Sequence, residues 1–189
     1  MGNHVGSLKK EEVEQLVSSS HFDSRELKSL FRDFKKDLPS GSAVVSRAEF
    51  KEIMTQMGIA DTFLHDLLFN VFDRNKDNTI NFQEFVCGLS VVIRGTPEEK
   101  IDFAFSLYDM DSDGYITRKD MELMLESMYR LVGSYVTCGG KRFDQQQDFI
   151  DDFFDKMDEN GDGLISKEAY KRGALKNADI LQGLRIVNQ

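Results

Sequence analysis

Asp73 to Glu84 reads DRNKDNTINFQE, and its pattern returns twice: Asp109 to Asp120 reads DMDSDGYITRKD, and Asp158 to Ala169 reads DENGDGLISKEA. Each stretch has an acid at its first position, Asp or Asn at its third, Asp at its fifth and Ile at its eighth. One acidic stretch could be a solvated turn, but three stretches in one register indicate a structural repeat. We therefore expect the repeat to decide the fold.

Amphipathic segments flank the three stretches. Phe69 and Phe72 precede the first, and Phe82, Phe85 and Leu89 follow it at helical spacing. A helix, a twelve-residue loop with oxygen donors at positions 1, 3, 5, 7 and 12, and a second helix form the EF-hand pattern, which binds Ca²⁺. The repeat is therefore similar to EF-hands, and it predicts a hard divalent cation as cofactor.

EF-hands work in pairs, so three loops predict a fourth hand. The Ile at position 8 of each loop is a β-forming residue, which we expect to pair with the neighbouring loop. Earlier in the chain, Ser24–Lys36 and Ser46–Met57 show helical spacing, and between these segments Leu38–Glu49 reads LPSGSAVVSRAE. Leu38 stands where an acid is needed, so this first hand should pair through Val45 and bind no metal.

The four hands predict an all-α fold of two EF-hand pairs, residues 1–94 and 95–189, with short antiparallel β bridges between paired loops. The boundary is placed after Arg94, because Thr96 and Glu99 form a capping box and Pro97 suits the first turn of a helix. The insertion 133–142 contains three glycines, and we expect it to be a mobile loop.

The second hand has a complete set of donors. They are Asp73, Asn75, Asp77, the carbonyl of Thr79, Asn81 and a bidentate Glu84. Position 6 holds Asn78 in place of the usual Gly, and Asn tolerates the left-handed backbone better than most residues. We expect this hand to bind Ca²⁺.

The third hand offers Asp109, Asp111, Asp113, the carbonyl of Tyr115 and Asp120. Asp120 is one methylene shorter than the usual Glu at position 12. It therefore reaches the ion less easily in bidentate fashion, which favours six-coordination. We expect this hand to bind Ca²⁺ more weakly and to tolerate Mg²⁺.

The fourth hand has oxygen donors at positions 1, 3 and 5, which are Asp158, Asn160 and Asp162, but position 12 is Ala169. Glu168 lies one residue too early and on a different face of the helix. We expect this loop to be empty or weak at physiological Ca²⁺.

Composition excludes several other functions. The chain has a formal net charge of −9, and the acidity is concentrated after Arg94, where 19 acids face 12 bases; nucleic acid is therefore not an expected partner. The sequence has no apolar run of membrane-spanning length and no secretory signal, and its two cysteines have no metal-binding spacing, so we expect a cytoplasmic protein. Its three histidines are scattered and no nucleophile motif is present, which argues against an enzyme.

With these residues in view, the chain resembles the neuronal calcium sensor family, which includes frequenin and recoverin, and most of all its frequenin branch. The resemblance covers nearly the whole chain and rests on five motifs: Leu8-Lys9-Lys10, Asp37 to Gly41, Phe72 to Phe85, Arg94-Gly95-Thr96, and Phe105 to Asp109. The chain departs from the family at Leu38, where a Cys is usual, and at Leu30, which stands in place of a Trp.

The resemblance implies an N-myristoyl group on Gly2 and reversible association with a membrane. The N-terminus reads MGNHVGS, with Gly6 where Ser or Thr is preferred. One myristoyl chain gives only marginal binding, so a second contact would be needed. The resemblance also suggests a phosphatidylinositol 4-kinase or a receptor regulator as the target.

The function that we expect is that of a calcium sensor, which exposes an apolar groove to a helix of a target protein. Candidates for the groove are Phe22, Leu30, Phe34, Phe50, Ile53, Met54, Phe69, Phe85 and Leu89. Each could instead be ordinary core. The segment Ala178 to Val187 could cover the groove or pack on the second pair. Two alternative functions are a Ca²⁺ buffer and a regulatory subunit similar to calcineurin B.

Overall fold

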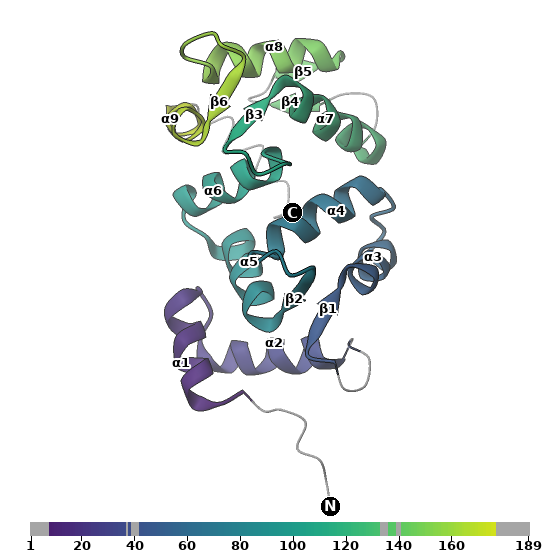
Figure 1. Cartoon of the computed structure of the whole chain (residues 1–189), viewed down its shortest axis with the longest axis vertical. Helices are drawn as coiled ribbons and strands as arrows, with labels where there is room; N and C mark the ends of the chain where they lie inside the picture. Colours follow the sequence, from purple (N-terminus) through teal and green to yellow (C-terminus); the bar gives the residue numbers. More distant parts are fainter. Residues whose placement is uncertain (1–7, 37, 39–41, 133–135, 139–140, 177–189) are drawn as a thin grey trace, which may run out of the picture.

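The computed structural model describes residues 8–36, 38, 42–132, 136–138 and 141–176. The first half contains α1 (Lys10–Ser19), α2 (Ser24–Lys36), β1 (Val44–Ser46), α3 (Arg47–Gln56), α4 (Thr62–Phe72), β2 (Thr79–Asn81) and α5 (Phe82–Arg94). The second half contains α6 (Pro97–Tyr108), β3 (Tyr115–Thr117), α7 (Arg118–Val132), β4 (Val136–Cys138), β5 (Lys141–Phe143), α8 (Gln146–Met157), β6 (Leu164–Ser166) and α9 (Lys167–Lys176). Figure 1 shows the two halves arranged along the long axis of the molecule.

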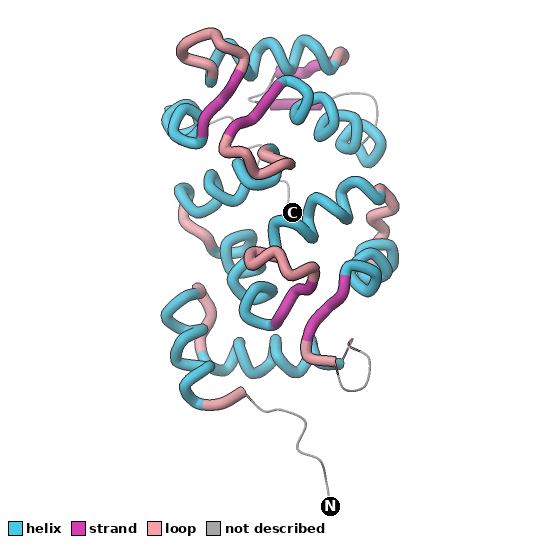
Figure 2. Tube along the Cα trace, in the orientation of Figure 1, coloured by secondary structure: helices cyan, strands magenta, loops and turns pink. Residues whose placement is uncertain are grey.

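Short β bridges join the hands in two pairs, as the sequence predicts. Strands β1 and β2 are antiparallel with Val45 opposite Ile80, and β3 and β6 are antiparallel with Ile116 opposite Ile165. Figure 2 shows both bridges as magenta segments between helices. The degenerate first loop therefore keeps its pairing role, and the predicted fold of paired EF-hands is confirmed.

Capping residues fix where the helices begin. Ser46, Asn81 and Thr96 each accept a hydrogen bond from the backbone N–H three residues later, and a Glu at that third position bonds back to the cap in each case. Such reciprocal caps satisfy backbone donors that would otherwise be unpaired at a helix start. In α5 the returning carboxylate is Glu84, so the cap also orients a predicted metal ligand.

Each pair of hands has its own apolar core. The first includes the fully buried Leu27, Phe69 and Ile80, and the second includes the fully buried Ile150 and Tyr170. Burying one large apolar side chain contributes about 1.5 to 3 kcal/mol. Each loop is thus held at the edge of a packed core by its flanking helices.

The two pairs also contact one another. Helix α4 packs against α6, and the ring of Phe72 meets that of Phe103 edge-on at 6.2 Å between centroids. A polar contact adds to this packing: Asp61, the cap of α4, accepts hydrogen bonds from Ser127 and Arg130 of α7. Helices of the second and third hands are therefore joined directly.

The insertion 133–142 corrects one prediction. We expected a mobile loop, but β4 and β5 form an antiparallel hairpin with Val136 opposite Phe143. Phe143 is buried, and its carbonyl accepts a hydrogen bond from the Tyr129 hydroxyl. Two short runs separated by Gly-Gly are a hairpin signal in the sequence, and the buried Phe143 anchors the hairpin to the core.

Within the described part of the chain, no helix is both long and apolar enough to cross a membrane. The predicted lipidation site at Gly2 and the predicted C-terminal segment Ala178 to Val187 lie outside the described residues.

Candidate metal centres

The three acidic loops share one backbone geometry. Positions 4 and 6 are left-handed in each: φ is 60° at Lys76 and 63° at Asn78, 60° at Ser112 and 91° at Gly114, and 70° at Gly161 and 80° at Gly163. Asn78 thus adopts at position 6 the conformation that Gly adopts in the other loops, as the sequence predicts. This conformation costs a residue with a Cβ more than it costs Gly.

The first acid of each loop holds this geometry in place. Asp73 accepts hydrogen bonds from the amides of Asp77 (3.1 Å) and Asn78 (2.9 Å). Asp109 accepts equivalent bonds from Asp113 and Gly114. Asp158 accepts from Gly163 at the same position 6, but its second bond comes from Gly161 at position 4. The loop backbone therefore turns around the carboxylate at position 1, as the EF-hand donor arrangement requires.

In the second hand the twelfth residue reaches across the loop. Glu84 Oε2 accepts from the Asn81 amide at 3.0 Å, and Glu84 Oε1 accepts from the Asn75 amide at 3.2 Å. Both Glu84 and Asp73 are buried, at 6% and 2% exposed. The carboxylate of position 12 thus closes the loop against position 3.

Asp77, at position 5 of this loop, is held in place by hydrogen bonds from its neighbours. Asp77 Oδ1 accepts from the Thr79 amide at 2.9 Å and from the Thr79 hydroxyl at 2.6 Å. The hydroxyl bond, with a further bond from the Asn75 side chain, lowers the pKa of the Asp77 carboxyl below its ordinary value. Asp77 therefore stays ionised, which is the form that a cation needs.

In the third hand three carboxylates gather, but the twelfth residue stays outside their group. Asp109, Asp111 and Asp113 offer oxygen atoms that all lie within 4.8 Å of one another. Asp120 Oδ2 instead accepts from the amide and hydroxyl of Thr117, at 2.8 and 2.6 Å. The shorter side chain thus caps α7, whereas Glu84 both caps α5 and reaches across its loop.

Crowding of carboxylates in the third hand has an electrostatic cost. Burial raises the pKa of the Asp109 carboxyl, and repulsion from Asp113 and Asp111 raises it further, which outweighs the hydrogen bonds from the amides of Gly114 and Asp113. A divalent cation at the centre of the three carboxylates would relieve this repulsion. The donor set, all oxygen, fits Ca²⁺ or Mg²⁺.

The fourth loop is open at position 12. Ala169 is buried with its amide donating to Ser166, while Glu168 is exposed to solvent on a different face of α9. Asp158, Asn160 and Asp162 remain in the loop. The donors of the fourth loop therefore include no bidentate carboxylate at position 12, as the sequence predicts.

The first loop has no carboxylate at its start. Leu38 packs against the first core, and Lys35 Nζ donates to the carbonyl of Ser42 at 2.6 Å. An ammonium group of the chain itself thus bonds to a carbonyl in this loop. The described residues of this loop include no carboxylate before Glu49.

Comparison with known proteins identifies the family. The EF-hand domain pair family matches residues 98–175, and a second family of the same description matches residues 41–89. The chain is 68% identical to the calcium-binding protein NCSA of Dictyostelium discoideum over 189 residues, which cover the whole of both chains. It is 34% identical to a recoverin family protein of the same organism, with 89% of this chain and 82% of that one covered.

The chain belongs to the neuronal calcium sensor family. It is a Ca²⁺-binding EF-hand protein, and neither of these relatives is named as an enzyme.

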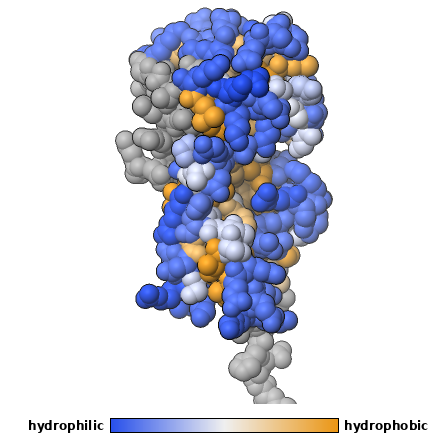
Figure 3. Space-filling model, turned by 90° about the vertical axis from the view of Figure 1, so that its left-hand side faces the viewer, coloured by the Kyte–Doolittle hydropathy of each residue, from blue (hydrophilic) through white to orange (hydrophobic). Residues whose placement is uncertain are grey.

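In this member of the neuronal calcium sensor family, the nine groove candidates all belong to the first core or pack against it. Phe22, Phe34, Phe50 and Phe69 are buried, whereas Leu30, Ile53, Met54, Phe85 and Leu89 are partly buried. Figure 3 shows apolar surface on one face as small patches between hydrophilic areas. In this conformation the candidates are therefore mostly occupied in packing.

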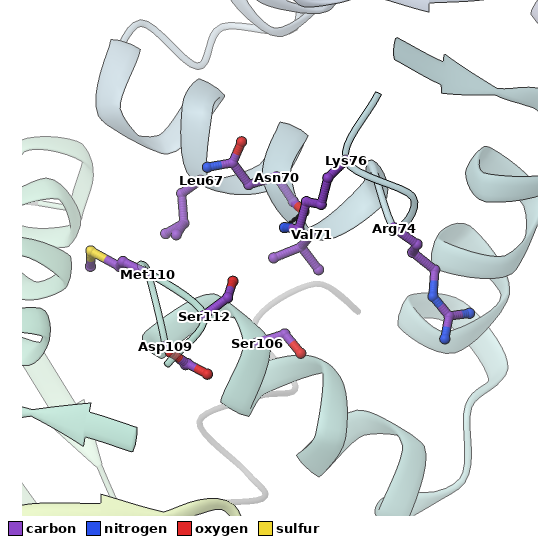
Figure 4. Close-up of a pocket in the computed structure, with 9 residues that line it drawn as sticks. All are labelled: Leu67, Asn70, Val71, Arg74, Lys76, Ser106, Asp109, Met110 and Ser112. Atoms are coloured by element: carbon purple, nitrogen blue, oxygen red, sulfur yellow. Dashed lines mark hydrogen bonds between the residues drawn. The ribbon is translucent and has the colours of Figure 1, made fainter. Parts of the chain in front are cut away.

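A cavity that no sequence motif indicated lies between the second and third loops. It has a volume of about 260 Å³ and is lined by Leu67, Asn70, Val71, Arg74, Lys76, Ser106, Asp109, Met110 and Ser112. Figure 4 shows that these residues come from α4, from α6 and from both loops. Because the cavity depends on how α4 packs against α6, no local motif could have indicated it.

Proposed function

We propose that the protein is a calcium sensor whose second and third hands are the working sites, and that occupation of the second hand exposes apolar surface of the first pair to a target helix. The observation that carries the proposal is the reach of Glu84 from α5 across its loop to Asn75. The ligand at position 12 links the ion to the exit helix, so its movement is transmitted to that helix.

Helix α5 carries both the ligand and part of the proposed groove. Phe85 follows Glu84 directly, and Leu89 lies one turn further on the same helix. Both pack against the first core, and the Phe85 ring lies 5.2 Å from that of Phe34 on α2. A shift of α5 would therefore change the packing of α2 and make room for an apolar helix from a partner.

A Ca²⁺ buffer would use the same loops but would open little on binding. The aromatic contacts that connect α2, α5 and the loop of the second hand favour the sensor. In the first core the Phe82 ring contacts Phe31, Phe34 and Phe85, and the Phe34 ring also contacts Phe85.

Calorimetric titration with Ca²⁺ in the presence of Mg²⁺ tests which loops work. We expect two binding events in the native chain, with Glu84→Gln removing one and Asp120→Ala removing the other. A third event that survives both substitutions would show that the fourth loop binds despite Ala169. If Glu84→Gln or Asp120→Ala removes no event, the assignment of working hands is wrong.

Fluorescence of an apolar-surface dye separates the sensor from the buffer. Addition of Ca²⁺ should raise dye fluorescence in the native chain and raise it far less in Glu84→Gln. An unchanged signal in the native chain, with both binding events present, would favour the buffer.

We also propose reversible attachment to a membrane from the cytoplasm, through a myristoyl group on Gly2. The support is the N-terminal sequence and the family membership, and a single chain would bind weakly without a second contact. Co-expression with an N-myristoyltransferase should raise the intact mass by one myristoyl group, and Gly2→Ala should abolish the increase. An unchanged mass in the native chain would reject the anchor.

A further inference from the structure

The register of the first β bridge brings the degenerate first hand to the metal loop of the second. Ser46 lies opposite Thr79 in this antiparallel bridge. Arg47 follows Ser46 and Asn78 precedes Thr79, so Arg47 and Asn78 lie beside one another. Figure 1 shows the end of β1 and the start of α3 next to β2 and α4. Arg47 is at position 10 of the first loop, and Asn78 is at position 6 of the second.

The Arg47 guanidinium makes four contacts with the second hand. Nη1 donates to Asp66 at 3.0 Å, and Nη2 donates to the side-chain oxygens of Asn70 at 2.8 Å and Asn78 at 3.4 Å. The group also lies over the Phe69 ring, 4.2 Å from its centroid. A planar group with several donors is thus fitted to helix α4 and to the loop that follows it.

A single further hydrogen bond connects Asn78 to Asp73, a predicted metal ligand. The Asn78 amide donates to Asp73 Oδ2 at 2.9 Å, and Asp73 is the first acid of the loop. Asn78 holds a left-handed backbone, with φ at 63°, which a residue with a side chain adopts at a cost. A hydrogen bond to its side chain therefore stabilises the loop conformation that fixes Asp73.

The other pair of hands provides an internal comparison. Position 10 of the fourth loop, Lys167, pairs with Asp102 of α6, and position 10 of the third loop, Arg118, pairs with Asp151 of α8. Asp66, Asp102 and Asp151 each lie seven residues before the first acid of their loop.

In both of these cases position 6 of the neighbouring loop is Gly, which offers no side chain to bond. Gly114 lies beside the position of Lys167, and Gly163 lies beside that of Arg118. Among the described residues, Arg47 is therefore the one position 10 residue that bonds to a side chain at position 6 of the neighbouring loop.

We propose that Arg47 is a positioning residue for Ca²⁺ binding by the second hand. The first hand, which has lost its own acids, supplies the group that holds Asn78, and through Asn78 it fixes the Asp73 carboxylate. The inference rests on the proposed role of the second hand as a working site. It assigns to the degenerate hand a part in setting the affinity of its neighbour, beyond pairing through Val45.

The test is calorimetric Ca²⁺ titration of Arg47→Lys and Asn78→Gly, singly and together. Arg47→Lys keeps the charge but loses the planar set of donors, so we expect the second-hand event to weaken about fivefold, as for the loss of one hydrogen bond of ordinary strength. In the Asn78→Gly background, the same Arg47→Lys change should alter affinity less than about twofold, because the acceptor is gone.

Two controls isolate the Arg47–Asn78 contact. Arg118→Lys is the matched change in the other pair, where position 6 is Gly163, and it should leave the second-hand event unaltered. Asn78→Ala keeps a Cβ but loses the acceptor, so it should weaken the event about as much as Arg47→Lys does. Thermal unfolding without Ca²⁺ verifies that each variant is folded.

The outcomes separate this inference from the proposed function. If Glu84→Gln removes no binding event, the second hand is not a working site and both fall. If Glu84→Gln removes one event and Arg47→Lys leaves that event unchanged, or weakens it equally in the native and Asn78→Gly backgrounds, the inference alone is wrong.

Discussion

The second and third loops have the same backbone but close differently at position 12. Glu84 bonds to the cap of its helix and to Asn75 across the loop, whereas Asp120 bonds only to Thr117 among the contacts described. The third loop instead gathers three carboxylates near its centre. Attraction for a cation and coupling to the exit helix are therefore separate properties, set by different positions of the loop.

The largest effect should come from giving the fourth loop the carboxylate that it lacks. Ala169→Glu places a bidentate ligand after Asp158, Asn160 and Asp162, whose loop already has left-handed residues at positions 4 and 6. We expect a new calorimetric Ca²⁺ event that is absent from the native chain. Ala169→Gln is the matched control, because it has similar size and no charge.

Ala169 is buried, so the added side chain must find room near the start of α9. Circular dichroism without Ca²⁺ would show whether the helices are retained. A folded Ala169→Glu variant without a third event would show that more than position 12 disables the fourth loop.

Exchange of the twelfth residues should produce the next largest effect. Glu84→Asp should weaken the second-hand event about tenfold, and Asp120→Glu should strengthen the third-hand event by a similar factor and raise its preference for Ca²⁺ over Mg²⁺. Titration with and without Mg²⁺ measures both. If Asp120→Glu leaves the affinity and the Mg²⁺ competition unchanged, side-chain reach at position 12 does not distinguish the two loops.

Whether a structural feature could be predicted from the sequence depends on how far apart in the chain its interacting residues lie. The loop ligands, the Val45–Ile80 bridge and the Thr96 cap follow from patterns within a few residues, and the structure shows the bridge and the cap as predicted. The hairpin of β4 and β5 was missed because the glycines of the insertion suggested only flexibility. Its signal, two short runs around Gly-Gly, was present in the sequence.

Contacts between elements far apart in the chain could not be predicted in the same way. The bond between Asp61 and Arg130 spans 69 positions, and it exists because α4 and α7 are brought together by the packing of the two pairs. Arg47 could have been placed beside Asn78 from the bridge register alone. Its bonds to Asp66 and Asn70 required the packing of α3 on α4.

A smaller effect should follow from breaking the contact between the two pairs. The Asp61 carboxylate, 8% exposed, accepts from Ser127, Arg130 and the Leu64 amide. Asp61→Asn should lower the free energy of unfolding by about 1 kcal/mol, as for one typical hydrogen bond, because the amide oxygen of Asn still accepts some of these bonds. Urea denaturation without Ca²⁺ measures the change, and Asp23→Asn, at an exposed helix cap, is the control.

The same contact predicts a dependence on pH. Burial raises the pKa of the Asp61 carboxyl, but hydrogen bonds from Arg130, Leu64 and Ser127 lower it more, so its pKa in the folded chain lies below 3.8. The stabilisation is therefore present above the unfolded pKa and is lost as the pH falls through the folded one. Between pH 6 and about pH 3, the difference in stability between the native chain and Asp61→Asn should shrink; a constant difference would contradict the role of the charge.

The smallest effect should come from the ion pairs at position 10 in the second pair of hands. Arg118 and Asp151 have side chains about half exposed, at 44% and 51%, so water and salt screen their attraction. Asp151→Asn should change the free energy of unfolding less than Asp61→Asn does, and still less at 1 M salt. Urea denaturation at low and high salt measures both values.

In the first pair of hands, the contact at the equivalent position 10 is aromatic and not ionic. There Phe82, at position 10 of the second loop, meets the Phe31 ring edge-on at 4.9 Å, and Phe31 stands where the other hands have an acid. An aromatic contact does not depend on salt, so Phe31→Leu should cost the same at both salt concentrations. A salt-dependent cost for Phe31→Leu, or a large salt-independent cost for Asp151→Asn, would show that the two contacts do not differ in physical origin.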